Sequence, residues 1–189
     1  NLSRQRFSNE MRGYSEHGSE VAAQPGHLAW DVFDSRGDAA ASGFYDYREI
    51  GKLGAIKKAG SISELAAVTG LPEATLADEF AQIAEAASKG KPDRFGRRFA
   101  ADQLLQPPYY AVKVNGALFH TQGGLVIDRD ARVLRQDGTP LPNLMAGGGA
   151  ARGLSGDSNY GYLSGNGLLS ATTFGRLAGM SAARIAAGK

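Results

Sequence analysis

The sequence contains no cysteine, and histidine and tryptophan are scarce: three histidines and one tryptophan occur among 189 residues. The absence of cysteine excludes disulfide bonds, thiolate metal sites and a cysteine nucleophile. No apolar run approaches the roughly 18 residues that a membrane span needs, and the first residues lead us to expect no signal peptide. We therefore predict no membrane span and no metal site, and we expect a cytoplasmic protein.

A strong excess of charge of either sign is also missing. The chain has 21 Lys and Arg against 19 Asp and Glu, which gives a formal net charge of +2. A protein whose main task is to neutralise the phosphates of a nucleic acid carries a larger basic excess. The composition therefore does not indicate a nucleic-acid partner.

Glycine, by contrast, is abundant and unevenly distributed. Eleven of the 26 glycines lie in residues 138–179, which separates an ordinary front part from a glycine-rich back part. A chain of this length suits one or two small domains. Because the first residue is Asn1 rather than Met, we expect a processed, trimmed or partial product.

Four segments have the composition of β-strands, with aromatic and β-branched residues gathered together. They are residues 29–34, 109–114, 125–127 and 133–134. The turn formers at residues 35–37 follow the first segment, which predicts a strand that ends in a turn.

Two helices are predicted between the first two of these strands. Ser61 and Glu64 form a capping box ahead of a short helix that Gly70 ends. Pro72 opens a second helix at a first-turn position, and Gly90 closes it.

The order and spacing of these two helices are also those of a helix-turn-helix DNA-binding motif. A recognition helix places polar or basic side chains along a phosphate-lined groove, but residues 72–88 contain no Lys or Arg. The second helix instead carries the carboxylates Glu73, Asp78, Glu79 and Glu85. These would repel DNA, so the pair is interpreted as two ordinary packed helices.

A basic segment follows the second helix, and two interpretations of it stay open. Its cations are Lys89, Lys91, Arg94, Arg97 and Arg98. They suit a solvated loop, and they also suit a loop that handles an anion above a site.

The last part of the chain predicts a long buried helix, because residues 168–187 are mostly apolar and small and contain no proline. Glycine clusters at residues 147–149 and 165–167 precede it. A helix start offers unpaired N–H groups and about half a positive charge, which suit an anion or a polarised carbonyl. A glycine-rich turn that merely permits tight packing explains the same pattern, and both interpretations stay open.

His120 lies between two predicted strands and close to the pair Gly123 and Gly124. An imidazole in this position suits contact with a ligand. A lone histidine is more often a structural residue, and the residues alone favour that interpretation.

Four segments in the back part resemble, in order and spacing, the C-terminal part of the FAD-dependent fumarate reductase/succinate dehydrogenase flavoprotein superfamily. The superfamily includes ketosteroid-dehydrogenase-like and tricarballylate-dehydrogenase-like branches. The segments are residues 120–128, 142–148, 165–169 and 174–179. The front part is similar to the substrate-capping domain of the same family, with residues 6–10 matching its Arg-Phe-x-Asn-Glu motif and residues 32–34 its following strand.

The resemblance implies an α+β fold in two parts. Residues 1–117 would form the substrate-capping domain, and residues 118–189 would form the C-terminal strands and helix of an α/β FAD-binding domain. The family's N-terminal half holds the ADP part of FAD with a Gly-x-Gly-x-x-Gly turn, and that motif is absent from this sequence. We therefore expect the upstream FAD-binding half of the same protein to be a partner of this chain.

The resemblance also implies the cofactor FAD and the residues that contact it. In the family, the helix that begins near Gly167 points its N–H groups at the pyrimidine edge of the flavin, which makes Gly167 and Leu168 the expected donors. The full set of expected cofactor-binding residues is Gly123, Gly124, Gly148, Gly149, Gly165, Asn166, Gly167, Leu168 and Leu169.

Two departures from the family pattern bear on the substrate. The usual Gly-Glu, whose carboxylate holds hydroxyls of FAD, is Gly148-Gly149 here. Tyr162 stands where fumarate reductases have the arginine that clamps a dicarboxylate, and a tyrosine thereabouts is similar to ketosteroid dehydrogenases. The expected catalytic residues are Tyr162, His120 and Arg36, and for Arg36 a solvated turn arginine is the alternative.

The resemblance thus implies a flavin-dependent oxidoreductase, or a fragment of one, that acts on a small-molecule substrate. It would add or remove hydrogen across a carbon–carbon bond next to a carbonyl, with hydride passing through flavin N5. The alternative is a cofactor-free capping or docking module that does not itself catalyse a reaction.

Overall fold

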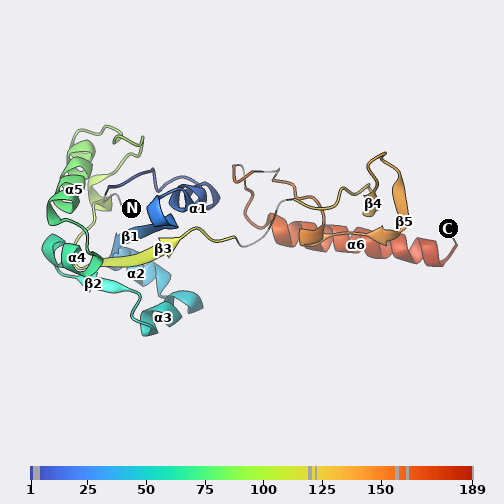
Figure 1. Cartoon of the computed structure of the whole chain (residues 1–189), viewed down its shortest axis with the longest axis horizontal. Helices are drawn as coiled ribbons and strands as arrows, with labels where there is room; N and C mark the ends of the chain where they lie inside the picture. The colour runs from blue at the N-terminus through green and yellow to red at the C-terminus, as the bar shows by residue number, and fades with distance from the viewer. Residues whose placement is uncertain (2–4, 119–120, 122, 156–157, 161, 189) are drawn as a thin grey trace. The chain divides into compact units, whose positions relative to one another are not determined.

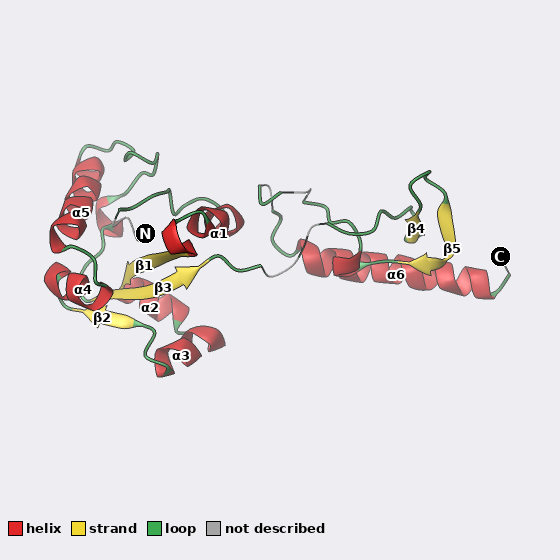
Figure 2. Cartoon of the chain, viewed as in Figure 1, coloured by secondary structure: helices red, strands yellow, loops and turns green. Residues whose placement is uncertain are grey.

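The computed structural model describes residues 1, 5–118, 121, 123–155, 158–160 and 162–188 (Figure 1). The chain separates into two compact units, Asn1–Gly116 and Ala117–Lys189. Helices predominate in both, and strands are few (Figure 2). No helix in the described ranges combines the length and the apolarity needed to cross a bilayer.

The first unit is a three-stranded antiparallel sheet with helices around it. Its strands are β1 (Leu28–Asp34), β2 (Lys57–Ala59) and β3 (Tyr109–Asn115), in the order β1-β3-β2. Its helices are α1 (Tyr14–Ala22), η1 (Pro25–His27), α2 (Ser35–Ala41), α3 (Tyr45–Lys52), α4 (Ile62–Thr69), α5 (Glu73–Ser88) and η2 (Ala101–Gln103). The predicted strands at residues 29–34 and 109–114 are therefore confirmed.

The hydrophobic core of this unit lies between one face of the sheet and the helices α4 and α5. Side chains alternate between the two faces of a strand, so Tyr109 and Ala111 share a face. Both are buried with Leu65 of α4 and Leu76 of α5. Phe80 of α5 contacts Tyr109 edge to face, with 5.3 Å between the ring centroids. The two helices thus bury their apolar sides against the sheet.

The opposite face of the sheet carries an aromatic cluster. Phe33 of β1 stacks on Tyr110 of β3 at a centroid distance of 5.8 Å, as expected for residues that pair directly across the strands. Tyr47 of α3 packs at 6.3 Å from the Phe33 ring and donates a hydrogen bond to Asp38 of α2 at 2.6 Å. Burial, and then this bond to a carboxylate, raise the pKa of Tyr47. This phenol is therefore a structural donor rather than a proton-transfer group near neutral pH.

The predicted ends of α4 and α5 are confirmed, with one adjustment at each helix start. Ser61 Oγ accepts a hydrogen bond from the Glu64 N–H at 3.1 Å, but the Glu64 carboxylate reaches the N–H of Gly60 rather than that of Ser61. Pro72 is the N-cap of α5, one position before the first turn. Gly70 adopts a left-handed conformation with φ of 71° and ends α4.

Three helices of this unit lie where the sequence predicted none. α1 lies within the polar N-terminal stretch, and α2 occupies residues 35–37, where a turn was predicted. That turn prediction was wrong because Asp34 caps a helix there: its side chain accepts a hydrogen bond from the Arg36 N–H at 3.0 Å. α3 follows after Phe44.

The second unit contains a short hairpin, a 3₁₀ turn and the long helix. The hairpin pairs β4 (Arg132–Leu134) with β5 (Pro140–Met145), and η3 (Gly148–Ala150) leads on toward α6 (Asn166–Ala186). Residues 125–127 form only isolated bridges, Leu125 with Ala151 and Ile127 with Val133, so the predicted strand there was wrong. The single-residue bridges leave no continuous ladder in this segment.

The long helix is confirmed, but the prediction that it is buried was wrong for most of its surface. Only one stripe of α6 contacts the small core of this unit: Asn166, Ser170 and Ser181 are buried, and Phe174 packs against that core. These positions recur at helical spacing and share one face. Among the described residues, the buried members of this core are the small set Val133, Ala146 and Ala151, which is too little to cover the other faces of a helix of 21 residues.

Candidate functional site

The N-terminus of α6 carries two backbone donors that are free within the described residues. Gly165 is the N-cap, with φ of 82°, a left-handed conformation that glycine adopts without strain. The N–H of Asn166 donates to Leu163 O at 3.1 Å and that of Leu169 to Gly165 O at 3.0 Å. The N–H groups of Gly167 and Leu168 have no acceptor in the described part of the chain.

This helix tip is open to a ligand. Leu168 is 78% exposed and Leu169 53% exposed. Apart from its chain neighbours and the backbone of its own helix, no described atom lies within 4 Å of where a Cβ of Gly167 would be. Free N–H groups at the positive end of a helix dipole attract an acceptor that carries negative charge. The geometry at Gly167 and Leu168 therefore fits a polarised carbonyl or an anion.

Asn166 has a different role from its neighbours. It is 2% exposed, and its Nδ2 donates a hydrogen bond to Ser155 Oγ at 2.6 Å. The same oxygen accepts a hydrogen bond from the Leu163 N–H at 3.1 Å. The Asn166 side chain thus faces the protein, and contact with a cofactor through that side chain stays a prediction.

The first glycine cluster divides into packed and open positions. A Cβ at Gly147 would lie 3.1 Å from Phe174 Cβ, and one at Gly148 would lie 3.4 Å from Ala171 Cβ. Gly147 therefore allows the start of η3 to approach α6 closely. A Cβ at Gly148 would make ordinary van der Waals contact, and glycine is favoured there by its φ of 57°. Gly149 has no atom within 4 Å of its Cβ position, so it leaves open space beside the chain.

The pair Gly123 and Gly124 divides in the same way. A Cβ at Gly124 would lie 2.5 Å from the carbonyl carbon of Ala151, so only glycine fits where this segment bridges to residue 151. Gly123 has open space around its Cβ position. Both were expected to bind the cofactor, and the structure gives Gly124 a packing role in addition.

The expected catalytic residues lie in different parts of the chain. Tyr162 is half-buried, interacts within the chain and immediately precedes the anchored residue Leu163. His120 lies outside the described residues. Arg36 belongs to the first unit.

Arg36 lies in the first turn of α2, where its side chain is 53% exposed and fully engaged in hydrogen bonds. Its Nε lies 3.1 and 3.0 Å from the two carboxylate oxygens of Asp34, and its Nη2 lies 2.6 Å from Asp34 Oδ2. The guanidinium also donates to the carbonyl oxygens of Asp102 and Leu104, on a segment more than 60 residues away. Hydrogen bonds from Arg36 lower the pKa of the buried Asp34 carboxyl to about 2. The expected role of Arg36 toward a substrate stays a prediction.

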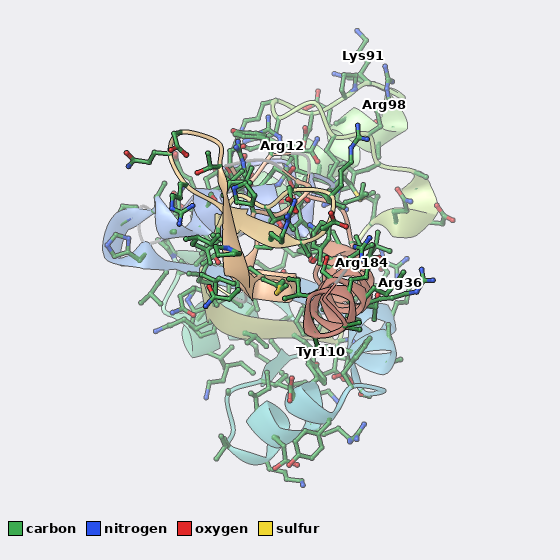
Figure 3. All side chains as sticks on the ribbon, turned by 90° about the vertical axis from the view of Figure 1, so that its right-hand side faces the viewer. Arg12, Arg36, Lys91, Arg98, Tyr110 and Arg184 are labelled. Carbon is green, nitrogen blue, oxygen red and sulfur yellow. The ribbon has the colours of Figure 1, made fainter. Side chains whose placement is uncertain are left out.

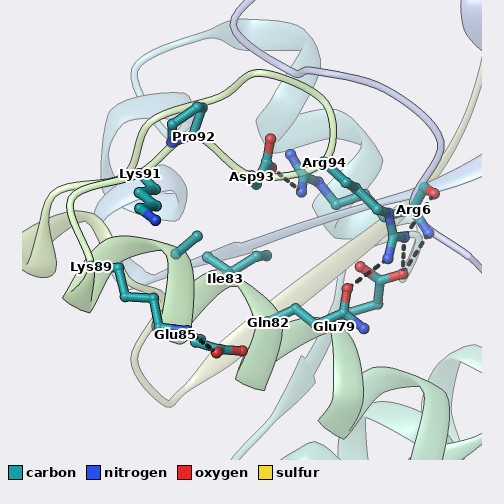
Figure 4. Close-up of a pocket in the computed structure, with 11 residues that line it drawn as sticks. Arg6, Glu79, Gln82, Ile83, Glu85, Lys89, Lys91, Pro92, Asp93 and Arg94 are labelled. Carbon is teal, nitrogen blue, oxygen red and sulfur yellow. Dashed lines mark hydrogen bonds and ion pairs between the residues drawn. The ribbon is translucent and has the colours of Figure 1, made fainter.

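A groove of about 240 Å³ lies beside α5 in the first unit (Figure 4). Apolar Ile83, Ala86 and Pro92 contribute to its lining, and Lys91 is a cation at its edge. The other charged groups of the lining are in ion pairs: Arg6–Asp93, Lys89–Glu85 and Arg94–Glu79. An incoming anion would compete with these carboxylates, so the contacts favour a structural interpretation of the basic segment.

The other cations of that segment are also engaged. Arg97 pairs with Glu10 at 2.7 Å, and Arg98 donates to Gly90 O at 2.8 Å. Figure 3 shows Lys91 and Arg98 at the outer edge of the side-chain envelope. Among the described residues, no group of three His, Asp or Glu side chains is arranged to hold a metal ion.

Residues 5–168 match the family model of the FAD binding domain. The chain belongs to this FAD binding domain family. The match spans both units, from the Arg6 segment to the first turn of α6, so it includes the open helix tip.

Relatives of this FAD binding domain protein include oxidoreductases of the fumarate reductase superfamily that the motifs resemble. It is 33% identical over 186 residues to the probable fumarate reductase Ifc3 of Shewanella frigidimarina, covering 97% of this chain and 30% of that protein. The structure of the open conformation of a flavocytochrome c3 fumarate reductase is similar, with a TM-score of 0.69, 31% identity, and coverage of 97% of this chain and 32% of the other.

A steroid-converting enzyme has a similar structure as well. The 3-ketosteroid Δ1-dehydrogenase of Sterolibacterium denitrificans, in complex with 1,4-androstadiene-3,17-dione, matches with a TM-score of 0.61 and 26% identity, covering 98% of this chain and 38% of that chain. These matches confirm the predicted resemblance to the superfamily and the predicted fold class. They also confirm FAD as the cofactor of the family. The chain spans about a third of the length of these relatives.

The residues of this FAD binding domain protein fit a flavin at one place in particular. The pyrimidine edge of a flavin presents carbonyl oxygens, which accept hydrogen bonds. Two adjacent N–H groups that find no acceptor among the described residues, at the exposed start of a helix, meet that requirement.

Proposed function

We propose that this chain forms the substrate cap and the C-terminal part of the FAD-binding domain of an oxidoreductase. The cap would be the first unit, Asn1–Gly116, and the flavin-facing part the second unit, Ala117–Lys189. The reaction would add or remove hydrogen across a carbon–carbon bond next to a carbonyl. The observation that carries the proposal is the pair of N–H groups at Gly167 and Leu168, which have no acceptor in the part of the chain that the structure describes, in a chain that belongs to an FAD-binding family.

When FAD is bound, it supplies the hydride chemistry, through flavin N5. The role of this chain is to stabilise the negative charge that reduction places on the pyrimidine edge. Gly167 and Leu168 would donate their N–H groups there, aided by the positive end of the α6 dipole. Such a helix end contributes about 0.3–1 kcal/mol where exposed, and up to ~2 kcal/mol where partly buried.

The proton that accompanies the hydride needs a donor or acceptor near the flavin. We assign that task to Tyr162 or His120, each of which carries an exchangeable proton. Tyr162 is held immediately before the helix tip, because the next residue, Leu163, is anchored to Ser155. A phenol in place of the dicarboxylate-clamping arginine favours a ketone or enone substrate over a dicarboxylate.

The names of the relatives support this reaction class. Fumarate reductases act on a carbon–carbon double bond beside a carboxyl group. The dehydrogenase matched above holds 1,4-androstadiene-3,17-dione, a ring ketone conjugated to carbon–carbon double bonds. The common element is an unsaturated bond adjacent to a carbonyl.

The test is the flavin content of the purified flavoprotein that contains these residues together with a dinucleotide-binding half. We expect a yellow protein with near-equimolar FAD and bleaching of its visible absorbance when a steroid ketone such as 4-androstene-3,17-dione is oxidised. A colourless protein would contradict the proposal and support the cofactor-free capping module.

A further inference from the structure

The hydroxyl group of Ser155, in the glycine-rich segment before α6, forms hydrogen bonds with Leu163 and Asn166, which lie immediately before and at the start of that helix. Ser155 Oγ accepts hydrogen bonds from the Leu163 N–H at 3.1 Å and from Asn166 Nδ2 at 2.6 Å. A serine oxygen has two acceptor lone pairs, so these two donors use its acceptor capacity completely. The hydroxyl therefore connects the start of the segment to its end and to the first residue of α6.

Hydrogen bonds of Leu163 and Asn166 contribute to holding the end of this segment in place. The Leu163 side chain is 61% exposed and gives the backbone no apolar anchor. The polar anchor is Asn166, which is buried and whose N–H also donates to Leu163 O at 3.1 Å. Three hydrogen bonds thus connect Ser155, Leu163 and Asn166 to one another. Of these residues, Asn166 belongs to the buried stripe of α6.

Two features of the proposed site depend on this set. Tyr162 is one peptide bond from the Leu163 N–H that Ser155 holds. Gly167 and Leu168, the proposed flavin donors, directly follow Asn166. A shift of the hydroxyl contact would therefore displace the phenol relative to the donors.

We propose that Ser155 is a positioning residue that sets the place of Tyr162 relative to the N-terminus of α6. The inference rests on the proposed role of Tyr162, and it adds a residue that neither the motif comparison nor the family match assigns. Ser155 acts through the Leu163 backbone and the Asn166 amide, and it does not itself contact substrate. Misplacement of a proton-transfer group by about 1 Å costs on the order of 100-fold in rate.

The experiment uses the complete flavoprotein with four variants: Ser155→Ala, Ser155→Thr, Tyr162→Phe and the double variant Ser155→Ala/Tyr162→Phe. Ser155→Ala removes both acceptor sites, whereas Ser155→Thr retains the oxygen. The matched control is Ser158→Ala, in the same segment, because Ser158 Oγ accepts only from the N–H of the exposed residue Tyr160 among the contacts of the described residues. The probes are 4-androstene-3,17-dione with an artificial electron acceptor, and fumarate with a reduced viologen dye.

For Ser155→Ala we expect kcat to fall roughly 10- to 100-fold with KM and flavin content nearly unchanged. Ser155→Thr should restore most of the activity, and Ser158→Ala should keep it. The decisive comparison is the double variant, which should be no slower than Tyr162→Phe alone, because residues that act through one group are not additive.

A second readout is independent of turnover. Amide hydrogen exchange at Leu163 should be at least about 10-fold faster in Ser155→Ala than in the wild type, with no change in Ser158→Ala. Unchanged exchange overturns the inference. Additive losses in the double variant, or a parallel loss of flavin and kcat, also overturn it.

Failure of the proposed function has a different signature. If Tyr162→Phe keeps full activity in a protein that holds FAD, the assignment of the proton to Tyr162 is wrong, and the positioning inference is wrong with it. If Tyr162→Phe is slow but Ser155→Ala is not, only the inference about Ser155 is wrong.

Discussion

Arg36 and Asp34 form a bidentate ion pair that joins the end of β1 to a distant loop. Three donor–acceptor distances between the two side chains lie between 2.6 and 3.1 Å, and Asp34 is 3% exposed. Asp34 also accepts a hydrogen bond from the Gln106 N–H at 3.2 Å. One carboxylate thus caps α2, holds the guanidinium and fixes the backbone near residue 106.

This pair predicts how the stability of the first unit depends on pH. The pKa of Asp34 is about 2 in the folded chain, below its ordinary value of 3.8. The stabilisation is therefore complete above about pH 5, where the carboxyl is ionised in both states, and is lost as the pH falls through 3.8 toward 2. Since the Arg36 side chain is half-exposed, solvent screens the pair and reduces its contribution to the free energy of unfolding.

Urea unfolding followed by Trp30 fluorescence tests this, because the chain has a single tryptophan and it lies in β1. Asp34→Asn should lower the free energy of unfolding at pH 7 and have a smaller effect at pH 3. The control is Asp78→Asn on the exposed side of α5, which should change stability by less than about 0.5 kcal/mol. A pH-independent loss in Asp34→Asn would contradict the assignment.

Arg6 is predicted to be the key residue of the N-terminal segment. Its guanidinium contacts Glu10 at 2.5 Å, pairs with Asp93, and lies 4.9 and 5.5 Å from the ring centroids of Phe95 and Phe99. Arg6→Ala would leave the buried Asp93 carboxylate without its cation. We therefore expect the free energy of unfolding to fall by about 2–3 kcal/mol.

The measurement is again urea unfolding at Trp30. Lys52→Ala removes a cation whose pair with Glu49 is exposed, and it should cost no more than about 0.5 kcal/mol. Equal effects for the two variants would show that the Arg6 contacts add nothing beyond an exposed pair.

Gly123 and Gly124 provide a matched pair for separating packing from ligand contact. Gly124→Ala should destabilise the second unit by about 1–3 kcal/mol, because its Cβ would meet backbone atoms of Ala151 and Ala150. Gly123→Ala meets open space and should leave the helical circular dichroism melt nearly unchanged. Similar melts for both variants would contradict the close approach.

The isolated chain is predicted to bind FAD weakly. Its sequence has no Gly-x-Gly-x-x-Gly turn to cradle the pyrophosphate, and ordering a half-formed site consumes binding free energy. Titration of FAD into the 189-residue chain, followed by flavin fluorescence, should give a dissociation constant well above 1 μM. Submicromolar affinity would refute the prediction.

Tyr162→Phe, in the complete flavoprotein, is predicted to slow turnover by more than about 100-fold while FAD binding changes less than threefold. The reason is that the substitution removes the hydroxyl group and its exchangeable proton but keeps the ring. Stopped-flow reduction of the flavin and FAD titration measure the two effects separately. Parallel losses would make Tyr162 a structural residue.

The sequence alone determined those features that depend on neighbouring residues. Ser61, Gly70 and Gly90 mark helix ends because capping and left-handed backbone conformations are local properties. The family motifs determined the cofactor for the same reason, since each of them is a short contiguous segment. The turn prediction at residues 35–37 failed because turns and helix N-caps use the same residue types: Asp34 caps a helix there. Hydrogen bonds to the backbone of Leu104 and Gln106 help to hold this helix start.

Only the tertiary structure decided which glycines pack and which stay open, because that depends on backbone that lies elsewhere in the chain. Gly124 meets Ala151, and Gly147 meets Phe174, whereas Gly123 and Gly149 meet nothing within 4 Å. It likewise separated Asn166, turned inward to Ser155, from the free donors that follow it. The sequence cannot distinguish adjacent glycines such as Gly123 and Gly124, since they differ only in the atoms that surround them in the folded chain.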